Sequence, residues 1–108
     1  MTPDVEIVRS AVNRMGIAFD LAEVDTAVQA DNLLQRVRAQ LVERIIQLLN
    51  TNPDRLMAIL YRIDVNEARV NDIFAHALPP DIPEEIADLV IERQLAKAET
   101  RARYKDQS

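Results

Sequence analysis

The single histidine, His76, is the first residue whose chemistry could matter, because an imidazole titrates near neutral pH and also binds metals. Asp72 stands four residues earlier, so on a helix its carboxylate would reach the ring and could orient it as a general base. The chain has no second histidine and no cysteine, and its two serines, Ser10 and Ser108, stand near its ends. We therefore expect His76 to be a helix-terminal residue, and we predict no catalytic residue, no metal site and no cofactor.

Carboxylates near the start of the last predicted helix are a second candidate, since paired carboxylates bind divalent cations or share a proton. Four of them lie along one or two faces of that helix: Glu84, Glu85, Asp88 and Glu92. Residues 64–92 contain eight acids and one arginine, whereas residues 93–105 contain five bases and one acid. Acids at the start of a helix and bases at its end suit the helix dipole. The pattern thus needs no ligand, and we do not expect an enzyme.

The basic end of the chain could contact phosphates while its tyrosine stacks on a base. The candidate nucleic-acid contacts are Arg101, Arg103, Tyr104 and Lys105. The whole chain carries a net charge of −5, which disfavours binding to a polyanion. The acids in the first half of the same helix would also repel a nucleic-acid backbone. We do not expect a nucleic-acid partner, and keep a small regulatory nucleic-acid-binding protein as the alternative function.

Charged residues also interrupt two otherwise apolar stretches. Arg62 and Asp64 do so in residues 57–64, and three more charges do so in residues 86–95, namely Asp88, Glu92 and Arg93. Our hypothesis is that the two stretches face each other and that Arg62 pairs with Asp88 or Glu92. Such a pair would fix the register between two helices more than it would stabilise them. In the alternative interpretation, each charge points to water.

Apolar residues at three- and four-residue spacing predict helices along the whole chain. The first helix is expected to end at Gly16, the only glycine, because glycine suits a left-handed position after a helix. The alternative is a helix that continues through Gly16, at a cost of about 1 kcal/mol relative to alanine. The stretch Asp20-Leu-Ala-Glu23 is a capping box for the next helix. The predicted helices 4–15 and 20–31 are either separate or continuous. Further helices follow over the apolar series 33–49, 56–63 and 70–78, and the last one runs from residue 82 to about residue 105.

Turn signals separate the later helices. Asn52 is expected to be an N-cap, with Pro53 at the first helical position. Two further capping boxes are Asp64-Val-Asn-Glu67 and Asp81-Ile-Pro-Glu84, and Pro79-Pro80 should stop the helix between them. A last helix that reaches residue 105 would be about 35 Å long, whereas a compact chain of this length has a radius of gyration of about 13 Å. We therefore expect its last turns to overhang the rest of the protein.

The fold class follows from these elements. The sequence has no run of alternating apolar and polar residues and no hairpin turn, so we predict an all-α fold without a sheet. Its 108 residues fit a single helical domain, with residues 1–31 as an N-terminal extension and residues 32–106 as the core. Short turns favour a small bundle or array of four to five antiparallel helices. No segment is apolar enough to act as a secretory signal or to cross a membrane, so we expect a cytoplasmic protein without membrane contact.

Two blocks of the sequence resemble a known group of proteins. Residues Leu60-Tyr-Arg-Ile-Asp-Val65 and Ile86-Ala-Asp-Leu-Val-Ile-Glu-Arg-Gln-Leu95, with Thr100-Arg101, resemble blocks in short uncharacterised bacterial proteins, chiefly of Bacteroidetes type. The resemblance covers roughly residues 33–104 and leaves the first thirty or so unmatched. It implies a small bacterial helical protein and brings no known activity, ligand or catalytic residue.

The leading functional expectation is a non-catalytic helical interaction or scaffold module that self-associates, as a homodimer, or binds a protein partner. Five amphipathic helices in 108 residues have limited area to bury against one another. Some apolar faces should therefore remain partly exposed in a monomer and pack in an oligomer. The candidate faces carry Leu33, Leu34, Ile46 and Leu49, or Ile91, Leu95 and Ala98.

Overall fold

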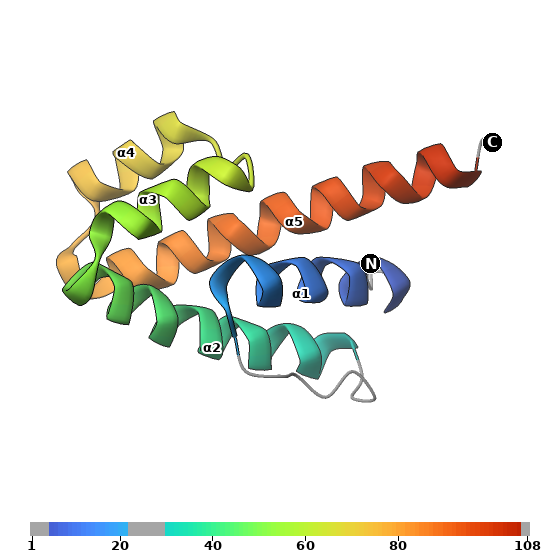
Figure 1. The fold of residues 1–108 in the computed structure, drawn as a ribbon, viewed down its shortest axis with the longest axis horizontal. Helices are drawn as coiled ribbons and strands as arrows, with labels where there is room; N and C mark the ends of the chain where they lie inside the picture. The colour runs from blue at the N-terminus through green and yellow to red at the C-terminus, as the bar shows by residue number, and fades with distance from the viewer. Residues whose placement is uncertain (1–4, 22–29, 107–108) are drawn as a thin grey trace.

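The computed structural model describes residues 5–21 and 30–106. In these ranges the chain forms five α-helices and one 3-10 turn, and no strand (Figure 1). The elements are α1 (Val5–Phe19), α2 (Ala30–Thr51), α3 (Pro53–Arg62), α4 (Glu67–His76), η1 (Pro79–Asp81) and α5 (Ile82–Asp106). The predicted all-α fold of four to five helices is confirmed. None of the described helices has an apolar stretch long enough to span a bilayer.

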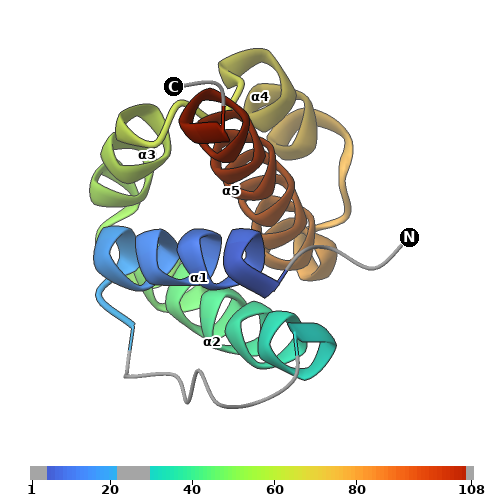
Figure 2. The same ribbon diagram turned by 90° about the vertical axis from the view of Figure 1, so that its right-hand side faces the viewer.

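Three helices form the centre of the protein, since α1, α2 and α5 all contact one another. Helix α3 packs chiefly on α2, and α4 packs on α5, so the shorter helices lie at one end of the molecule (Figures 1 and 2). From α2 to α5, successive helices run in opposite directions, as short turns predict. Helices α1 and α2 instead run the same way (Figure 1). The ten residues between Phe19 and Ala30 are long enough for this, because α1 is only about 22 Å long.

The core is built from the helical stripes that the spacing predicts. Helix α1 supplies five buried residues, so the expected N-terminal extension is part of the central core. On α2, Ile45 is fully buried, whereas the neighbouring Ile46 is 42% exposed. The buried residues of α1, α2 and α5 are Val8, Ala11, Val12, Met15, Phe19, Leu33, Val37, Leu41, Ile45, Leu48, Pro83, Ile86, Ala87, Leu89, Val90, Gln94 and Ala98.

The end of α1 differs from the prediction. The helix continues through Gly16 to Phe19, whose side chain is fully buried. A glycine inside a helix costs about 1 kcal/mol relative to alanine, which burial of a Phe side chain outweighs. Asp20 takes the left-handed conformation (φ 53°), and the Leu21 N–H donates to the Gly16 carbonyl at 2.9 Å. Asp20 therefore ends α1 and does not act there as the N-cap of a following helix. Residues 22–29 of the predicted helix 20–31 lie outside the described residues.

The turn between α3 and α4 also corrects a prediction. Asp64 is left-handed (φ 62°), and the Val65 N–H donates to the Leu60 carbonyl while the Asp64 N–H donates to the Tyr61 carbonyl. These two bonds define a Schellman motif, which closes the C-terminus of α3. The expected capping box at Asp64 is wrong, because Asn66 caps α4 and its side chain accepts from the Arg69 N–H at 3.2 Å.

The other boundaries are set by local chemistry. Asn52 caps α3 as predicted, since its side chain accepts from the Arg55 N–H, and Pro53 follows at the first position. Helix α4 ends at His76, before the expected Leu78. Asp81 belongs to the 3-10 turn that leads into α5, so it does not occupy the extended N-cap position of a capping box.

The last helix overhangs the body of the protein. With 25 residues it is about 37 Å long, close to the 41 Å of the longest molecular axis. Its final turns extend beyond α1 (Figure 1), and Tyr104 is 72% exposed there. The predicted overhang is confirmed.

Candidate functional site

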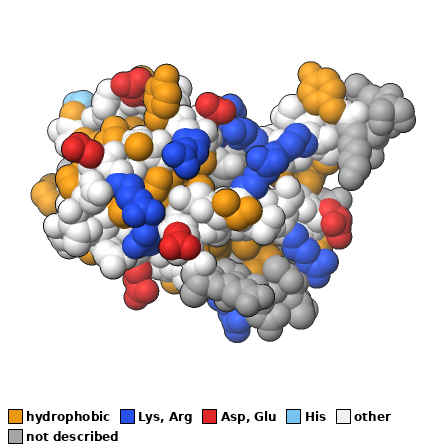
Figure 3. All heavy atoms as spheres, in the orientation of Figure 1, with side chains coloured by type: hydrophobic (Ala, Val, Ile, Leu, Met, Phe, Trp, Pro, Cys, Tyr) orange, Lys and Arg blue, Asp and Glu red, His pale blue; other side chains and the backbone are white. Residues whose placement is uncertain are grey.

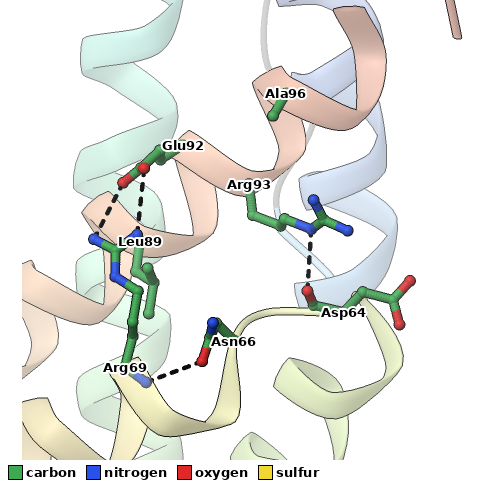
Figure 4. Close-up of a pocket in the computed structure, with 7 residues that line it drawn as sticks. All are labelled: Asp64, Asn66, Arg69, Leu89, Glu92, Arg93 and Ala96. Carbon is green, nitrogen blue, oxygen red and sulfur yellow. Dashed lines mark hydrogen bonds and ion pairs between the residues drawn. The ribbon is translucent and has the colours of Figure 1, made fainter. Parts of the chain in front are cut away.

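The two sequence blocks meet at the turn between α3 and α4. Residues 60–65 form the end of α3 and its Schellman turn, and residues 86–95 form the part of α5 that faces this turn (Figure 4). Between them lies a pocket of about 440 Å³. The residues that line it are Asp64, Asn66, Arg69, Leu89, Glu92, Arg93 and Ala96. The prediction that the two stretches face each other is confirmed.

Helix α5 holds this turn with three side chains, which we call the turn clamp: Arg93, Gln94 and Lys97. Arg93 Nε donates to the Asp64 carbonyl at 3.1 Å, and Lys97 Nζ lies 3.1 Å from Asp64 Oδ2. Gln94 Nε2 donates to the Ile63 carbonyl at 3.2 Å. The last carbonyls of a helix have no partner within the helix. The turn clamp therefore satisfies the end of α3 and ties it to α5.

Gln94 was missed by the sequence interpretation. It is 2% exposed and is the one polar side chain buried within the described ranges. A spacing signal was present, because Ile86, Val90, Gln94 and Ala98 follow one another at four-residue intervals on one face of α5. A glutamine in such an apolar series needs a hydrogen-bond partner, and the Ile63 carbonyl is that partner.

The predicted partner of Asp88 and Glu92 was wrong. Arg38 of α2 binds Asp88 with two hydrogen bonds of 2.7 and 3.3 Å, and Arg69 of α4 binds Glu92 with bonds of 3.3 and 3.4 Å. Arg62 is exposed and forms no ion pair with the described residues. The side chains that α3 turns inward include Leu56, Ile59 and Leu60, and Arg62 lies on the opposite side of the helix.

These two ion pairs link α5 to its neighbouring helices. The hydrogen bond with Asp88 raises the pKa of Arg38 above its ordinary value, so the arginine remains charged. The side chains of Arg38 and Asp88 are 39% and 59% exposed. Exposed pairs contribute at most about 1 kcal/mol each. Their consequence is geometric, since they link α5 to α2 on one side and to α4 on the other.

His76 has the partner that its spacing predicts. Its Nδ1 lies 2.9 Å from Asp72 Oδ1 and 3.2 Å from the Asp72 carbonyl. Both side chains are more than 70% exposed at the end of α4. This arrangement agrees with a helix-terminal histidine. Glu84 and Glu85 are exposed as well, and the described residues contain no group of three ligands that could hold a metal ion.

The basic end of α5 is partly neutralised. Arg103 donates to Glu99 at 2.7 Å, and Lys97 is engaged with Asp64. Arg101 is half-buried, whereas Tyr104 is exposed; the side chain of Lys105 lies outside the described residues. Lys and Arg side chains gather over the second half of α5 (Figure 3), but two of them already pair with carboxylates.

The expected apolar faces are mostly covered. Leu33 and Ala98 are buried, so the prediction that they remain exposed is wrong. Leu34, Leu49, Ile91 and Leu95 pack against the core and are half-buried, and Ile46 alone of this set is exposed. The core of three helices provides more mutual area than the sequence suggested.

An apolar groove lies elsewhere, between α3 and α4, because these helices pack on α2 and α5 rather than on each other. Its lining residues are Met57, Leu60, Tyr61, Val65, Glu67 and Val70. We call it the α3–α4 groove. Tyr61 is 79% exposed, and Phe74, one turn after Val70, is 38% exposed. Met57 is 37% exposed, whereas its neighbours Leu56, Ile59 and Leu60 are buried in the core.

Comparison with protein-family models, with curated proteins and with solved structures finds no match. The resemblance to short bacterial helical proteins stays a prediction that rests on the two blocks. The structure adds a physical role for both, since they form the Schellman turn and the turn clamp.

Proposed function

We propose that the protein is a non-catalytic interaction module that self-associates as an antiparallel homodimer. The observation that carries this proposal is the separation of charge along the longest axis of the molecule. Residues 64–92 contain eight acids and one arginine, and residues 93–105 contain five bases and one acid. Helix α4 and the start of α5 lie at one end of the molecule, and the last turns of α5 lie at the other (Figure 1).

The acidic end combines charge with exposed apolar area. Glu67 lines the α3–α4 groove beside Met57 and Tyr61. Glu84 and Glu85 are exposed on the first turn of α5. Apolar side chains gather over this end of the molecule (Figure 3). Such a surface suits an occupant with an apolar body and a positive charge.

The basic end offers an occupant of that kind. Tyr104 and Arg103 are exposed on turns of α5 that extend beyond the body. A tyrosine buries a large ring at low entropic cost while its hydroxyl remains hydrated. The occupant to which we commit is therefore the end of α5 from a second copy, with Tyr104 in the α3–α4 groove and Arg103 beside Glu67.

In an antiparallel dimer, the acidic end and the basic end of each copy both find a partner of opposite charge. Two copies that lie side by side in opposite directions bring each basic end onto the acidic end of the other copy. The arrangement is closed by a two-fold axis, so it ends at a dimer and does not grow into a fibre. Parallel pairing would instead oppose like charges. Most charged groups of the candidate site are engaged in the ion pairs Arg38–Asp88, Arg69–Glu92 and Lys97–Asp64, which supports an interaction role over catalysis.

Sedimentation equilibrium tests this proposal. We expect a species of twice 12.3 kDa in low salt that dissociates as salt is raised, because the Debye length falls from about 30 Å at 0.01 M to about 3 Å at 1 M. Glu67→Arg and Arg103→Glu should each weaken the dimer, and the double variant should restore it. Glu43→Arg, an exposed charge on α2, is the matched control and should leave the dimer intact.

The results of this experiment distinguish the dimer from its alternatives. A wild-type monomer at millimolar concentration in low salt would overturn the proposal, as would a dimer that both single variants leave unchanged. Circular dichroism of each variant confirms that its helices remain. The nucleic-acid alternative predicts instead that short duplex DNA binds the monomer in low salt. The net charge of −5, which disfavours binding to a polyanion, favours the protein–protein proposal.

A further inference from the structure

A second pocket lies between α1 and α5, away from the turn clamp and from the α3–α4 groove. Its volume is about 350 Å³, within the range of pockets that bind small molecules. Its polar lining consists of Glu6, Ser10, Arg14 and Arg101, and the remaining lining residues are apolar. Ser10 and Arg14 stand one turn apart on α1, and Arg101 reaches the pocket from α5.

Two arginines and one carboxylate, that of Glu6, line the pocket, so its charge is net positive. Nη2 of Arg101 is buried and has no hydrogen-bond partner among the described residues. Burying an unpaired donor is unfavourable, and such groups are rare in folded proteins. Arg14 is exposed and forms no ion pair with the described residues. Glu6 pairs with Arg9 at 3.8 Å and stands two turns of α1 from Arg14.

We propose that this pocket binds the phosphate group of a small phosphorylated molecule. A guanidinium presents a planar fork of N–H donors that matches phosphate oxygens, so Arg14 and Arg101 can bind the group from two sides. The two arginine charges outnumber the one carboxylate of Glu6, so the pocket attracts a phosphate monoester, and the Ser10 hydroxyl can donate a further bond. Ile7, Ala98 and Ala102 would contact the apolar part of the ligand. This site is independent of the proposed dimer, since it uses neither Arg103 nor Glu67.

Thermal unfolding with inorganic phosphate and with phenyl phosphate tests the site. Each is compared with sodium chloride and sodium acetate at equal ionic strength. At ten times its Kd, phosphate should raise Tm by about 7 °C. Phosphate also stabilises proteins through exclusion from their surface, so the decisive comparison is between variants. Arg14→Gln and Arg101→Gln should lose the specific rise, whereas Arg36→Gln, which removes an exposed arginine of α2 outside the pocket, should keep it.

Arg14 keeps the test informative if Arg101→Gln fails to fold, because Arg14 is exposed and its replacement should leave the unliganded Tm unchanged. Isothermal titration of phenyl phosphate into the wild type should show one site per chain, lost in Arg14→Gln. An equal rise of Tm in wild type and Arg14→Gln would overturn the proposal. So would an equal effect of acetate, because the site would then not select phosphate.

Discussion

Replacing Gln94 by leucine tests whether the turn clamp holds α3 to α5. Gln94 is 2% exposed, and its Nε2 donates to the Ile63 carbonyl at 3.2 Å. Leucine has a similar size but no donor, so the Ile63 carbonyl would remain without a partner beside the core. Leaving one buried polar group unpaired costs about 1–3 kcal/mol, and the extra apolar surface of leucine offsets part of this. We expect a loss of about 1–2 kcal/mol from the free energy of unfolding.

Urea unfolding followed by circular dichroism measures this change. For a chain of this length, 1 kcal/mol corresponds to about 5 °C in Tm, so a thermal scan gives a second readout. Gln35→Leu is the matched control, because Gln35 is exposed on α2 and its replacement should change stability by less than about 0.5 kcal/mol. If Gln94→Leu is as stable as this control, the hydrogen bond does not hold the turn and the reasoning is refuted.

Gln94→Glu distinguishes the hydrogen bond from shape alone. A carboxylate at this position would be desolvated and would face a carbonyl oxygen, so folding should raise the pKa of the new glutamate above its usual value of about 4.3. The protonated form can still donate to the Ile63 carbonyl. The stability of this variant should therefore be highest below about pH 4.3 and should fall, relative to wild type, as the pH rises through the raised pKa. A variant whose difference from wild type does not change with pH would contradict the assignment.

Three further substitutions test the backbone and the surface, each by urea unfolding. Gly16→Ala should stabilise the protein by about 0.5–1 kcal/mol, because Gly16 is helical and a Cβ there meets no atom within 4 Å; destabilisation would show that the site is crowded. Asp64→Val should cost about 1–2 kcal/mol more than Asp64→Gly, since only glycine tolerates the left-handed φ of 62° freely; equal costs would rule out that strain. Arg62→Met should change stability by less than about 0.5 kcal/mol, and a large loss would revive a buried pair at Arg62.

Local signals predicted the helices well, and competition between signals explains the errors at their ends. The start of α3 was predictable because Asn52 and Pro53 act through bonds within one turn. The end of α1 was not predictable, because the burial of Phe19 arises from packing in the core and outweighs the local preference of Gly16. Asp64 satisfies the pattern of a capping box, but the Schellman bonds of the preceding helix place it in the left-handed region.

The partners of the charged residues depend on how the helices pack, which the amino-acid sequence does not show directly. The spacing of apolar residues indicates that Asp88 and Glu92 lie outside the buried face of α5. From the sequence alone, the contact between residues 60–65 and residues 86–95 was a hypothesis. Which cation each acid meets depends on how far α2 and α4 slide and rotate against α5. That register is set by interlocking core side chains, so Arg38 and Arg69 emerge only from the packed structure.

The weak contact between α3 and α4 has a consequence for how the native state opens. Helix α4 contributes only Val70 to the buried core and half-buries Ile73 against it. Its polar attachments are exposed bonds at its first turn and to α5. Elements with few buried contacts open with less free energy than global unfolding requires. Backbone amides of α4 should therefore exchange with deuterium through local detachment while α1, α2 and the middle of α5 stay protected. The chain thus contains a cooperative three-helix unit and a smaller unit that can detach from it without unfolding the whole.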